Sequence, residues 1–164
     1  MGCFFSGHRE LPAEHIEAIY KFTRKKIIEA VEKYSIYDFY AGGAVGYDMI
    51  ASIMVLSVKR NKFKHINLNL VLPTPDYGAR NWKTVQEREY YRIILQGVKR
   101  IETISPTPYH GINFVRNNRL IECGCNLGIV YSEPYHKSGG TYHAIKTAEK
   151  NEIPIINIYN DILK

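Results

Sequence analysis

The chain has 164 residues, of which 45% are hydrophobic and 23% are charged, a balance typical of one globular domain with its own core. No apolar run approaches the roughly 18 residues that span a membrane, and the first residues lack the pattern of a secretory signal, so we expect a cytoplasmic protein. The 22 basic and 16 acidic residues give a formal net charge of +6, which favours phosphate-bearing partners but does not distinguish a nucleotide from a nucleic acid.

Hydrophobic periodicity predicts strands and helices that alternate along the chain. A strand at 3–5 precedes a helix at 12–34, a strand at 37–41 precedes a helix at 46–60, and a strand at 65–72 precedes a helix at 83–97. A strand at 100–105, a helix at 111–123, a strand at 126–132, a helix after Gly139 and Gly140, and a strand at 153–159 complete the order. This alternation predicts an α/β protein: a single-domain Rossmann-like three-layer α/β/α sandwich over residues 1–164, with a mainly parallel sheet of about six strands.

The three cysteines predict neither a disulfide framework nor a metal site. Cys3, Cys123 and Cys125 are odd in number, and no second group of ligands at metal-binding spacing accompanies the Cys-Gly-Cys sequence. We therefore expect small buried thiols and no metal.

The loops that follow the predicted strands are rich in glycine, histidine, arginine, tyrosine and hydroxyl residues. They are residues 6–10, 42–48, 73–82, 105–111 and 132–140. In a parallel sheet of this type, ligands bind beyond the carboxyl ends of the strands, near the point where strand order reverses. The sequence therefore predicts a polar ligand pocket at this edge of the sheet.

Several residues of these loops suit a phosphate or a nucleoside. Arg9 could contact phosphate through two donors, with further donors at Ser6 and Gly7. His8 suits either a hydrogen-bonding role or that of a general base. Gly139, Gly140 and Thr141 start a helix, where they form either a simple turn and cap or a cradle for phosphate.

Other candidates have a structural interpretation that is equally open. Asp48 either favours the dipole of its helix or holds a ribose hydroxyl. Arg116 either supplies charge to a phosphate or forms a surface ion pair. Tyr77 and Trp82 either stack on a base or pack in the interior.

Six motifs in this order resemble the YpsA-like family of the SLOG superfamily, which also includes the Smf/DprA DNA-processing proteins and the Lonely Guy phosphoribohydrolases. They are FSGHREL, GGAVGYDMIAS, LVLPTPDYGARNW, YYRIILQGVKRIETIS, FVRNNRLIECGCNLGIVYSE and SGGTYHAIKTAEKNEIPIINI, and they cover nearly the whole chain. The resemblance implies a Rossmann-like fold and a pocket for a nucleotide-derived ligand, such as ADP-ribose or a dinucleotide. It implies ligand contacts from Ser6, Gly7, His8, Arg9, Gly43, Gly46, Asp48, Arg116, Asn117, Gly139, Gly140 and Thr141.

Three functions follow from these observations. The first is binding of a nucleotide-derived ligand by a sensor or regulatory protein. The second is hydrolysis of a nucleotide N-glycosidic bond, with Glu133, Glu149 or His8 as acid or base, although the glutamate of the Lonely Guy motif PGGxGTxxE has no counterpart after Thr141. The third is binding of single-stranded DNA, which the scattered basic residues disfavour. Self-association into a homo-oligomer is compatible with the superfamily.

Overall fold

A computed structural model describes residues 1–164 and contains one sheet of six parallel strands. The strands are β1 (Gly2–Gly7), β2 (Asp38–Ala41), β3 (Asn67–Leu72), β4 (Arg100–Thr103), β5 (Cys125–Tyr131) and β6 (Ile155–Asn157). Their order is β4-β3-β2-β1-β5-β6, and each neighbouring pair is parallel. The predicted single-domain α/β fold with a Rossmann-like three-layer arrangement is confirmed.

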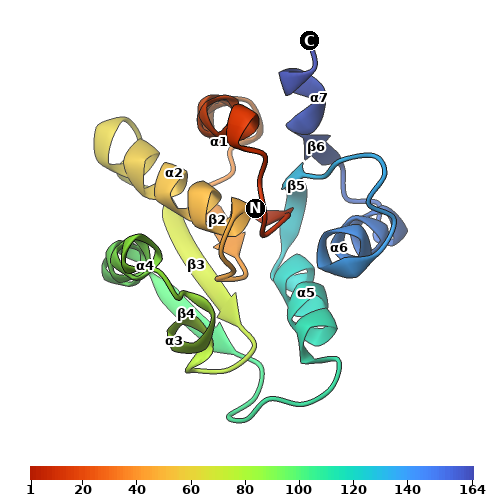
Figure 1. Ribbon diagram of the computed structural model, residues 1–164. Helices are drawn as coiled ribbons and strands as arrows, with labels where there is room; N and C mark the ends of the chain where they lie inside the picture. Colours follow the sequence, from red (N-terminus) through yellow and green to blue (C-terminus); the bar gives the residue numbers. More distant parts are fainter.

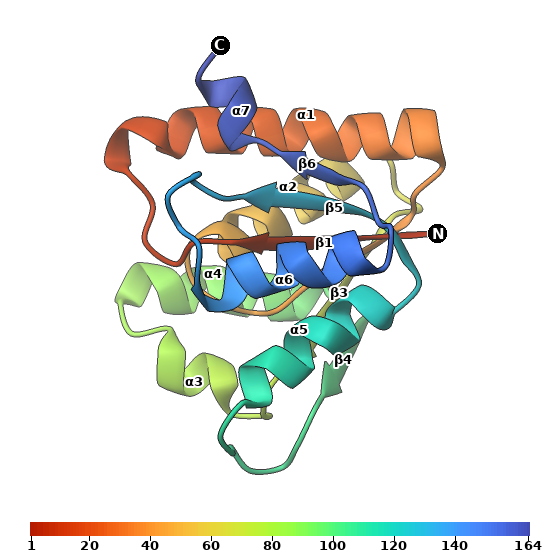
Figure 2. The ribbon, with the colours of Figure 1, turned by 90° about the vertical axis from the view of Figure 1, so that its right-hand side faces the viewer.

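Helices cover both faces of the sheet (Figure 1). On one face lie α1 (Ile16–Tyr34), which follows a short 3-10 turn at Ala13–His15, α2 (Tyr47–Asn61), α4 (Val85–Gly97) and the short α7 (Tyr159–Ile162). On the other face, which is in front in Figure 2, lie α5 (Ile112–Glu122) and α6 (Gly139–Lys150). The crossovers from β1 to β4 proceed in one direction and those from β4 to β6 return past β1 in the other, so right-handed connections place the two groups of helices on opposite faces. The strand order therefore reverses between β1 and β5.

The core consists of two apolar layers, one on each face of the sheet. Phe5 of β1 and Phe39 of β2 belong to the larger layer, against α1, α2 and α4, and their rings stack at a centroid distance of 5.9 Å. Phe4 belongs to the smaller layer, together with Leu120 of α5 and Ala144 of α6. Neighbouring residues of a strand face opposite sides, so a strand buried on both sides needs apolar residues in succession. The Cys-Phe-Phe sequence of β1 meets this requirement.

The last part of the chain differs from the prediction of a strand at 153–159. β6 ends at Asn157, whose side chain accepts a hydrogen bond from Ser132 N at 3.1 Å and donates one to Ser132 O at 2.7 Å. Asn157 Oδ1 also accepts a hydrogen bond from Tyr159 N at 3.2 Å, at the start of α7. These side-chain bonds replace the strand ladder and hold the end of β5, and periodicity alone does not reveal them.

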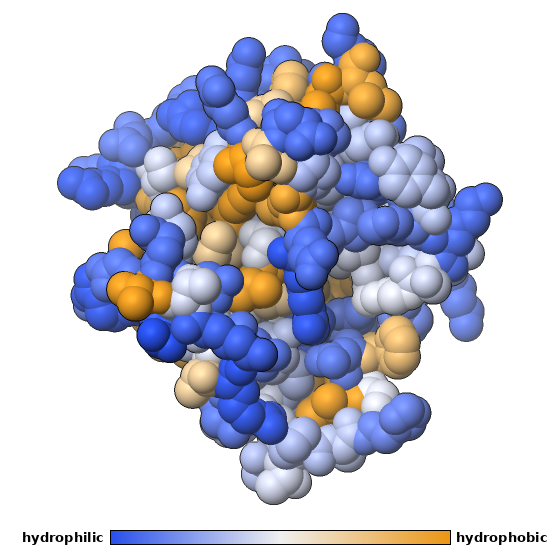
Figure 3. Space-filling view, in the orientation of Figure 1, coloured by the Kyte–Doolittle hydropathy of each residue, from blue (hydrophilic) through white to orange (hydrophobic).

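The outer surface is mixed in character. On the face shown in Figure 3, hydrophobic residues form separate patches among hydrophilic ones. None of the helices has both the length and the apolar composition needed to span a bilayer.

A short helix that the sequence pattern did not predict, α3 (Tyr77–Asn81), leads into Trp82 and α4. Trp82 is only 1% exposed, packs against Tyr91 at a centroid distance of 4.8 Å and donates a hydrogen bond from Nε1 to Gly43 O at 2.8 Å. Tyr77 is also buried, with 5% exposure. Of the two interpretations left open for Trp82, the structure shows packing in the interior, where the ring fixes the α3–α4 segment to the loop after β2.

Replacing Trp82 by phenylalanine tests this anchoring role. Trp82→Phe leaves the buried carbonyl of Gly43 without its donor, so we expect the free energy of unfolding to fall by about 1–3 kcal/mol. Urea unfolding followed by circular dichroism measures the change. Val85→Ala serves as a control because Val85 is 79% exposed, and it should change stability by less than about 0.5 kcal/mol. Equal stability of wild type and Trp82→Phe would contradict the anchoring role.

Candidate ligand-binding site

A cleft of about 500 Å³ opens where the strand order reverses, beyond the carboxyl ends of β1 and β5. We call it the main cleft. It is lined by residues 5–10, 44, 48, 109, 111–114, 116, 117, 120, 136 and 138–141. Its size is within the range of small-molecule sites, and its position is where doubly wound sheets bind ligands. The predicted location of the pocket thus coincides with a cavity in the structure.

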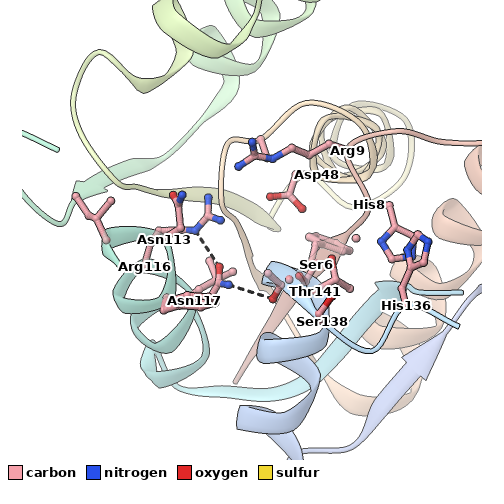
Figure 4. Close-up of a pocket in the computed structure, with 18 of the residues that line it drawn as sticks. Ser6, His8, Arg9, Asp48, Asn113, Arg116, Asn117, His136, Ser138 and Thr141 are labelled. Atoms are coloured by element: carbon pink, nitrogen blue, oxygen red, sulfur yellow. Dashed lines mark hydrogen bonds between the residues drawn. The ribbon is translucent and has the colours of Figure 1, made fainter. Parts of the chain in front are cut away.

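The N-terminus of α6 forms one wall of the main cleft (Figure 4). Ser138 occupies the N-cap position, but its side chain makes no capping hydrogen bond. The first N–H groups of a helix have no partner within the helix and carry the positive end of its dipole. Thr141 is only 8% exposed, lines the cleft, and its hydroxyl has no hydrogen-bond partner in the protein. Hydrogen-bond donors that have no partner in the protein therefore lie together at the N-terminus of α6.

Gly140 leaves the approach to these donors open. A Cβ atom added at Gly140 would meet only Asn117 Nδ2, at 3.6 Å, which is an ordinary contact. The fold therefore tolerates a side chain here, and the absence of one leaves space beside the N–H groups. This differs from the adjacent Gly139, whose φ of +86° is a left-handed conformation that favours glycine.

A buried hydrogen-bonded chain holds α6 in place. Arg116 of α5 donates from Nη1 to Gly42 O at 2.7 Å and from Nε to Asn117 Oδ1 at 3.0 Å. Asn117 in turn donates from Nδ2 to Gly140 O at 3.1 Å. Figure 4 shows these side chains between α5 and the first turn of α6. The chain links the loop after β2 to the N-terminus of α6, so Arg116 and Asn117 are positioning residues. Their direct contact with a ligand stays a prediction.

Asp48 lies on the other side of Gly42. Its Oδ2 accepts a hydrogen bond from Gly42 N at 3.2 Å. Gly42 therefore binds two charged side chains: its N–H binds the carboxylate of Asp48, and its carbonyl oxygen binds the guanidinium of Arg116. Burial raises the pKa of Asp48 from 3.8 to about 6, and Arg116 and the N–H groups of Ala44 and Gly42 offset part of that rise. Asp48 is therefore mostly ionised at pH 7 and close to titration.

The segment after β1 contributes Ser6, Gly7, His8 and Arg9 to the main cleft. A Cβ at Gly7 would lie 2.4 Å from Cβ of the buried Tyr47, so glycine is required there by packing against α2. Arg9 is exposed and donates from Nη2 to Tyr77 Oη at 3.1 Å, which leaves its other donors free. The segment brings one cation and several small groups to the lining of the cleft.

His8 is held in one tautomer. Its Nε2 accepts a hydrogen bond from Glu133 N at 3.0 Å, so the ring proton resides on Nδ1. Burial and the neighbouring ring of His136, at a centroid distance of 4.3 Å, lower the pKa of His8, and Glu133 opposes this. His8 is therefore neutral at pH 7, and the lone pair that a general base would use is already engaged.

The two glutamates considered as acid or base do not line the main cleft. Glu133 accepts a hydrogen bond from Tyr131 Oη at 3.0 Å, and hydrogen bonds from Tyr135 and Tyr131 lower its pKa, which keeps it ionised. Glu149 lies near the end of α6, where it is exposed and pairs with Lys146 at 2.8 Å. Neither carboxylate is therefore part of the cleft lining that includes the N-terminus of α6.

Two of the predicted glycines also lie outside the cleft lining. A Cβ at Gly43 would collide with Leu72, and one at Gly46 would collide with the main chain of His8 and Arg9. Both have positive φ values, so they allow the loop after β2 to turn closely against β3 and the segment after β1.

Sequence reasoning missed several residues of the site. Gly42 joins Asp48 to Arg116, and the sequence did not distinguish it from its neighbour Gly43. Ser138 and His136 lie within the loop that precedes α6, where the glycines and Thr141 drew attention instead. The remaining lining residues without a prediction are Phe5, Glu10, Ala44, Tyr109, Gly111, Ile112, Asn113, Phe114 and Leu120.

Comparison with known proteins adds the family. The model of the YpsA family, described as the YspA SLOG family, matches residues 5–163. The chain belongs to this family. No curated protein is significantly similar to it. Membership in the YspA SLOG family fits a nucleotide-related function in broad terms, and the match extends over all parts of the main cleft.

The pH dependence of stability tests the environment of Asp48 in this SLOG protein. Between about pH 4 and 6, folded Asp48 retains a proton that the unfolded chain has released, because its pKa rises from 3.8 to about 6 on folding. Asp48 thus makes stability fall as pH rises through this window, by roughly 3 kcal/mol in total. The penalty is complete above about pH 6 and absent below about pH 4.

Asp48→Asn removes this titration. We expect the difference in unfolding free energy between wild type and Asp48→Asn to change by roughly 3 kcal/mol between pH 4 and 6, in the direction that favours the variant at higher pH. Urea unfolding at four pH values across the window measures it. Parallel pH profiles for the two proteins would show that Asp48 titrates normally.

Proposed function

We propose that the protein binds a nucleotide-derived ligand in the main cleft and acts as a sensor or regulatory protein. The observation that carries the proposal is the N-terminus of α6. It has no side-chain cap, and beside it the hydroxyl of Thr141, a residue that is 8% exposed, borders the cleft without a hydrogen-bond partner in the protein. A phosphate oxygen satisfies both, since the helix dipole and N–H groups favour an anion and the hydroxyl adds a donor.

The charges around the cleft support a phosphate more than a neutral ligand. Arg9 and Arg116 line the cleft from two sides, and Figure 4 shows Arg9 and Arg116 on either side of the space beyond α6. Glu10 and Asp48 are the acidic residues in the lining. Asp48 lines the cleft, and a carboxylate can accept hydrogen bonds from ribose hydroxyls, so we assign the sugar to this side and the phosphate to α6.

Hydrolysis of an N-glycosidic bond and binding of single-stranded DNA have less support. Glu133 and Glu149 lie outside the main cleft, and the lone pair of His8 is engaged by Glu133 N. DNA would require contacts to many phosphates, whereas the lining of the cleft contains two arginines, Arg9 and Arg116, and no lysine. Release of free base from a nucleotide, or a steep fall of affinity with salt, would revive these alternatives.

Gly140→Ala tests the phosphate cradle. Alanine is compatible with the space next to Asn117 and stabilises a helix by up to about 1 kcal/mol relative to glycine, so the protein should unfold at the same or higher urea concentration. The methyl group nevertheless fills the approach to the N–H groups. We expect affinity for AMP and ADP-ribose to fall by about tenfold or more in calorimetry. A stable variant with unchanged affinity would place the phosphate elsewhere.

Arg9→Ala tests the exposed cation of the cleft. Loss of a charge-assisted hydrogen bond should weaken binding of the same two nucleotides by about tenfold or more. Arg119→Ala is the matched control, because Arg119 is exposed, pairs with Glu102 at 2.6 Å and does not line the cleft. Equal affinities of the two variants, or no binding of AMP, ADP-ribose or NAD by the wild type, would contradict the proposed function.

A further inference from the structure

A second hollow of about 390 Å³ adjoins the main cleft between the loop that precedes α2 and the α3–α4 segment. We call it the Lys83 hollow. Tyr77 and Asn81 of α3, and Lys83 and Glu87 beyond it, contribute to its lining together with Arg9. Arg9 also lines the main cleft, so the two cavities meet at this side chain.

Arg9 is positioned at the border of the two cavities by a fixed partner. Its Nη2 donates to Tyr77 Oη at 3.1 Å, and Tyr77 is only 5% exposed, so the phenol oxygen has little freedom to move. One guanidinium donor is used in this bond, while the other four remain available. A ligand that extends from one cavity into the other would therefore place an anionic group beside the guanidinium of Arg9.

Some polar groups of the Lys83 hollow are already hydrogen-bonded within the protein, and others have no partner there. Glu87 Oε2 accepts hydrogen bonds from Lys83 N at 2.7 Å and Thr84 N at 3.0 Å, so its carboxylate belongs to the cap of α4. The ammonium of Lys83 has no ion-pair partner and is exposed. Asn81 donates from Nδ2 to Tyr77 O at 2.7 Å, and its Oδ1 remains free as an acceptor. The hollow thus offers a cation and an acceptor for hydroxyl groups beside an aromatic wall.

We propose that the Lys83 hollow is a second subsite, and that the ligand is a nucleoside diphosphate whose distal phosphate carries a further hydroxylated group. This inference rests on the proposed function. The phosphate nearer the nucleoside binds at α6, the distal phosphate contacts Arg9, and the further group enters the hollow. There Asn81 Oδ1 accepts from a hydroxyl, and Lys83 adds positive charge beside the diphosphate.

A third hollow, of about 350 Å³, borders the main cleft on the opposite side, at His136. Its lining includes Lys137 and also Glu133, whose carboxylate is ionised. The Lys83 hollow also contains an ionised glutamate, Glu87, so the acidic residues do not distinguish the two hollows. We assign the second group to the side of Arg9 because the residue that this hollow shares with the main cleft is a guanidinium, whereas the residue shared on the other side is His136. Lys137 consequently serves as a matched control for Lys83, since both are exposed lysines in hollows beside the main cleft.

The experiment measures binding of AMP and ADP-ribose to wild type, Lys83→Ala and Lys137→Ala by calorimetry. AMP is the probe for the main cleft alone, and ADP-ribose carries the diphosphate and a further sugar. We expect wild type to bind ADP-ribose about tenfold or more tightly than AMP. Lys83→Ala should weaken ADP-ribose by about fivefold while AMP changes by less than about twofold, and Lys137→Ala should leave the ratio of the two affinities unchanged.

Three results would overturn the subsite. The first is that wild type binds AMP and ADP-ribose with equal affinity. The second is that Lys83→Ala weakens binding of both probes equally. The third is that Lys137→Ala changes the ratio of the two affinities while Lys83→Ala does not. In each of these cases AMP still binds, and the proposed function survives. If neither probe binds the wild type, the proposed function fails and the second subsite fails with it.

Discussion

The hydrogen bonds of Arg116 unite the parts of the site that come from distant segments of the chain. The guanidinium joins the carbonyl of Gly42, after β2, to Asn117, and Asn117 reaches the first turn of α6. Arg116 is 7% exposed and Asn117 4%, so these bonds form in a region of low dielectric, where removal of one partner leaves the others unsatisfied. The direction in which α6 presents its N–H groups to the main cleft depends on this chain.

The same glycine also sets the electrostatics of the cleft. Gly42 binds Asp48 through its N–H and Arg116 through its carbonyl, and a Cβ at this position would lie 2.6 Å from Arg116 Nη1 and 3.0 Å from Asp48 Oδ2. Only a residue without a side chain lets both charged groups approach the main chain together. Even with this cation nearby, burial has the larger effect on Asp48 and raises its pKa to about 6. The cleft therefore combines arginine side chains with a carboxylate that is mostly ionised at pH 7 and takes up a proton when the pH falls to about 6.

Much of this arrangement was predictable because it depends on local patterns. The apolar periodicity of α1, α2 and the central strands, and the glycines and Pro73 that end the strands, are sufficient to give the fold and the edge at which loops converge. The pairing of Arg116 with Gly42 spans 74 positions and joins a helix to a loop, so no periodic signal marks it. Trp82 shows a similar limit. The sequence leaves open whether its indole group stacks on a base or packs in the interior, and the contact with Tyr91, which joins α3 to α4 in space, decides between the two.

The distribution of carboxyl groups explains why binding is better supported than cleavage. Cleavage of an N-glycosidic bond by acid–base catalysis requires a group that can exchange a proton at the site of reaction. Glu133 is fixed in its ionised form by the hydroxyls of Tyr131 and Tyr135, and it faces the hollow that contains Lys137. Asp48 has a pKa that suits proton exchange, but Gly42 and Ala44 N–H groups and Arg116 direct its oxygens toward the loop after β2. The first N–H groups of α6 and most donors of Arg9, by contrast, have no partner within the protein, so the groups left for a ligand are those that hold an anion rather than those that transfer a proton.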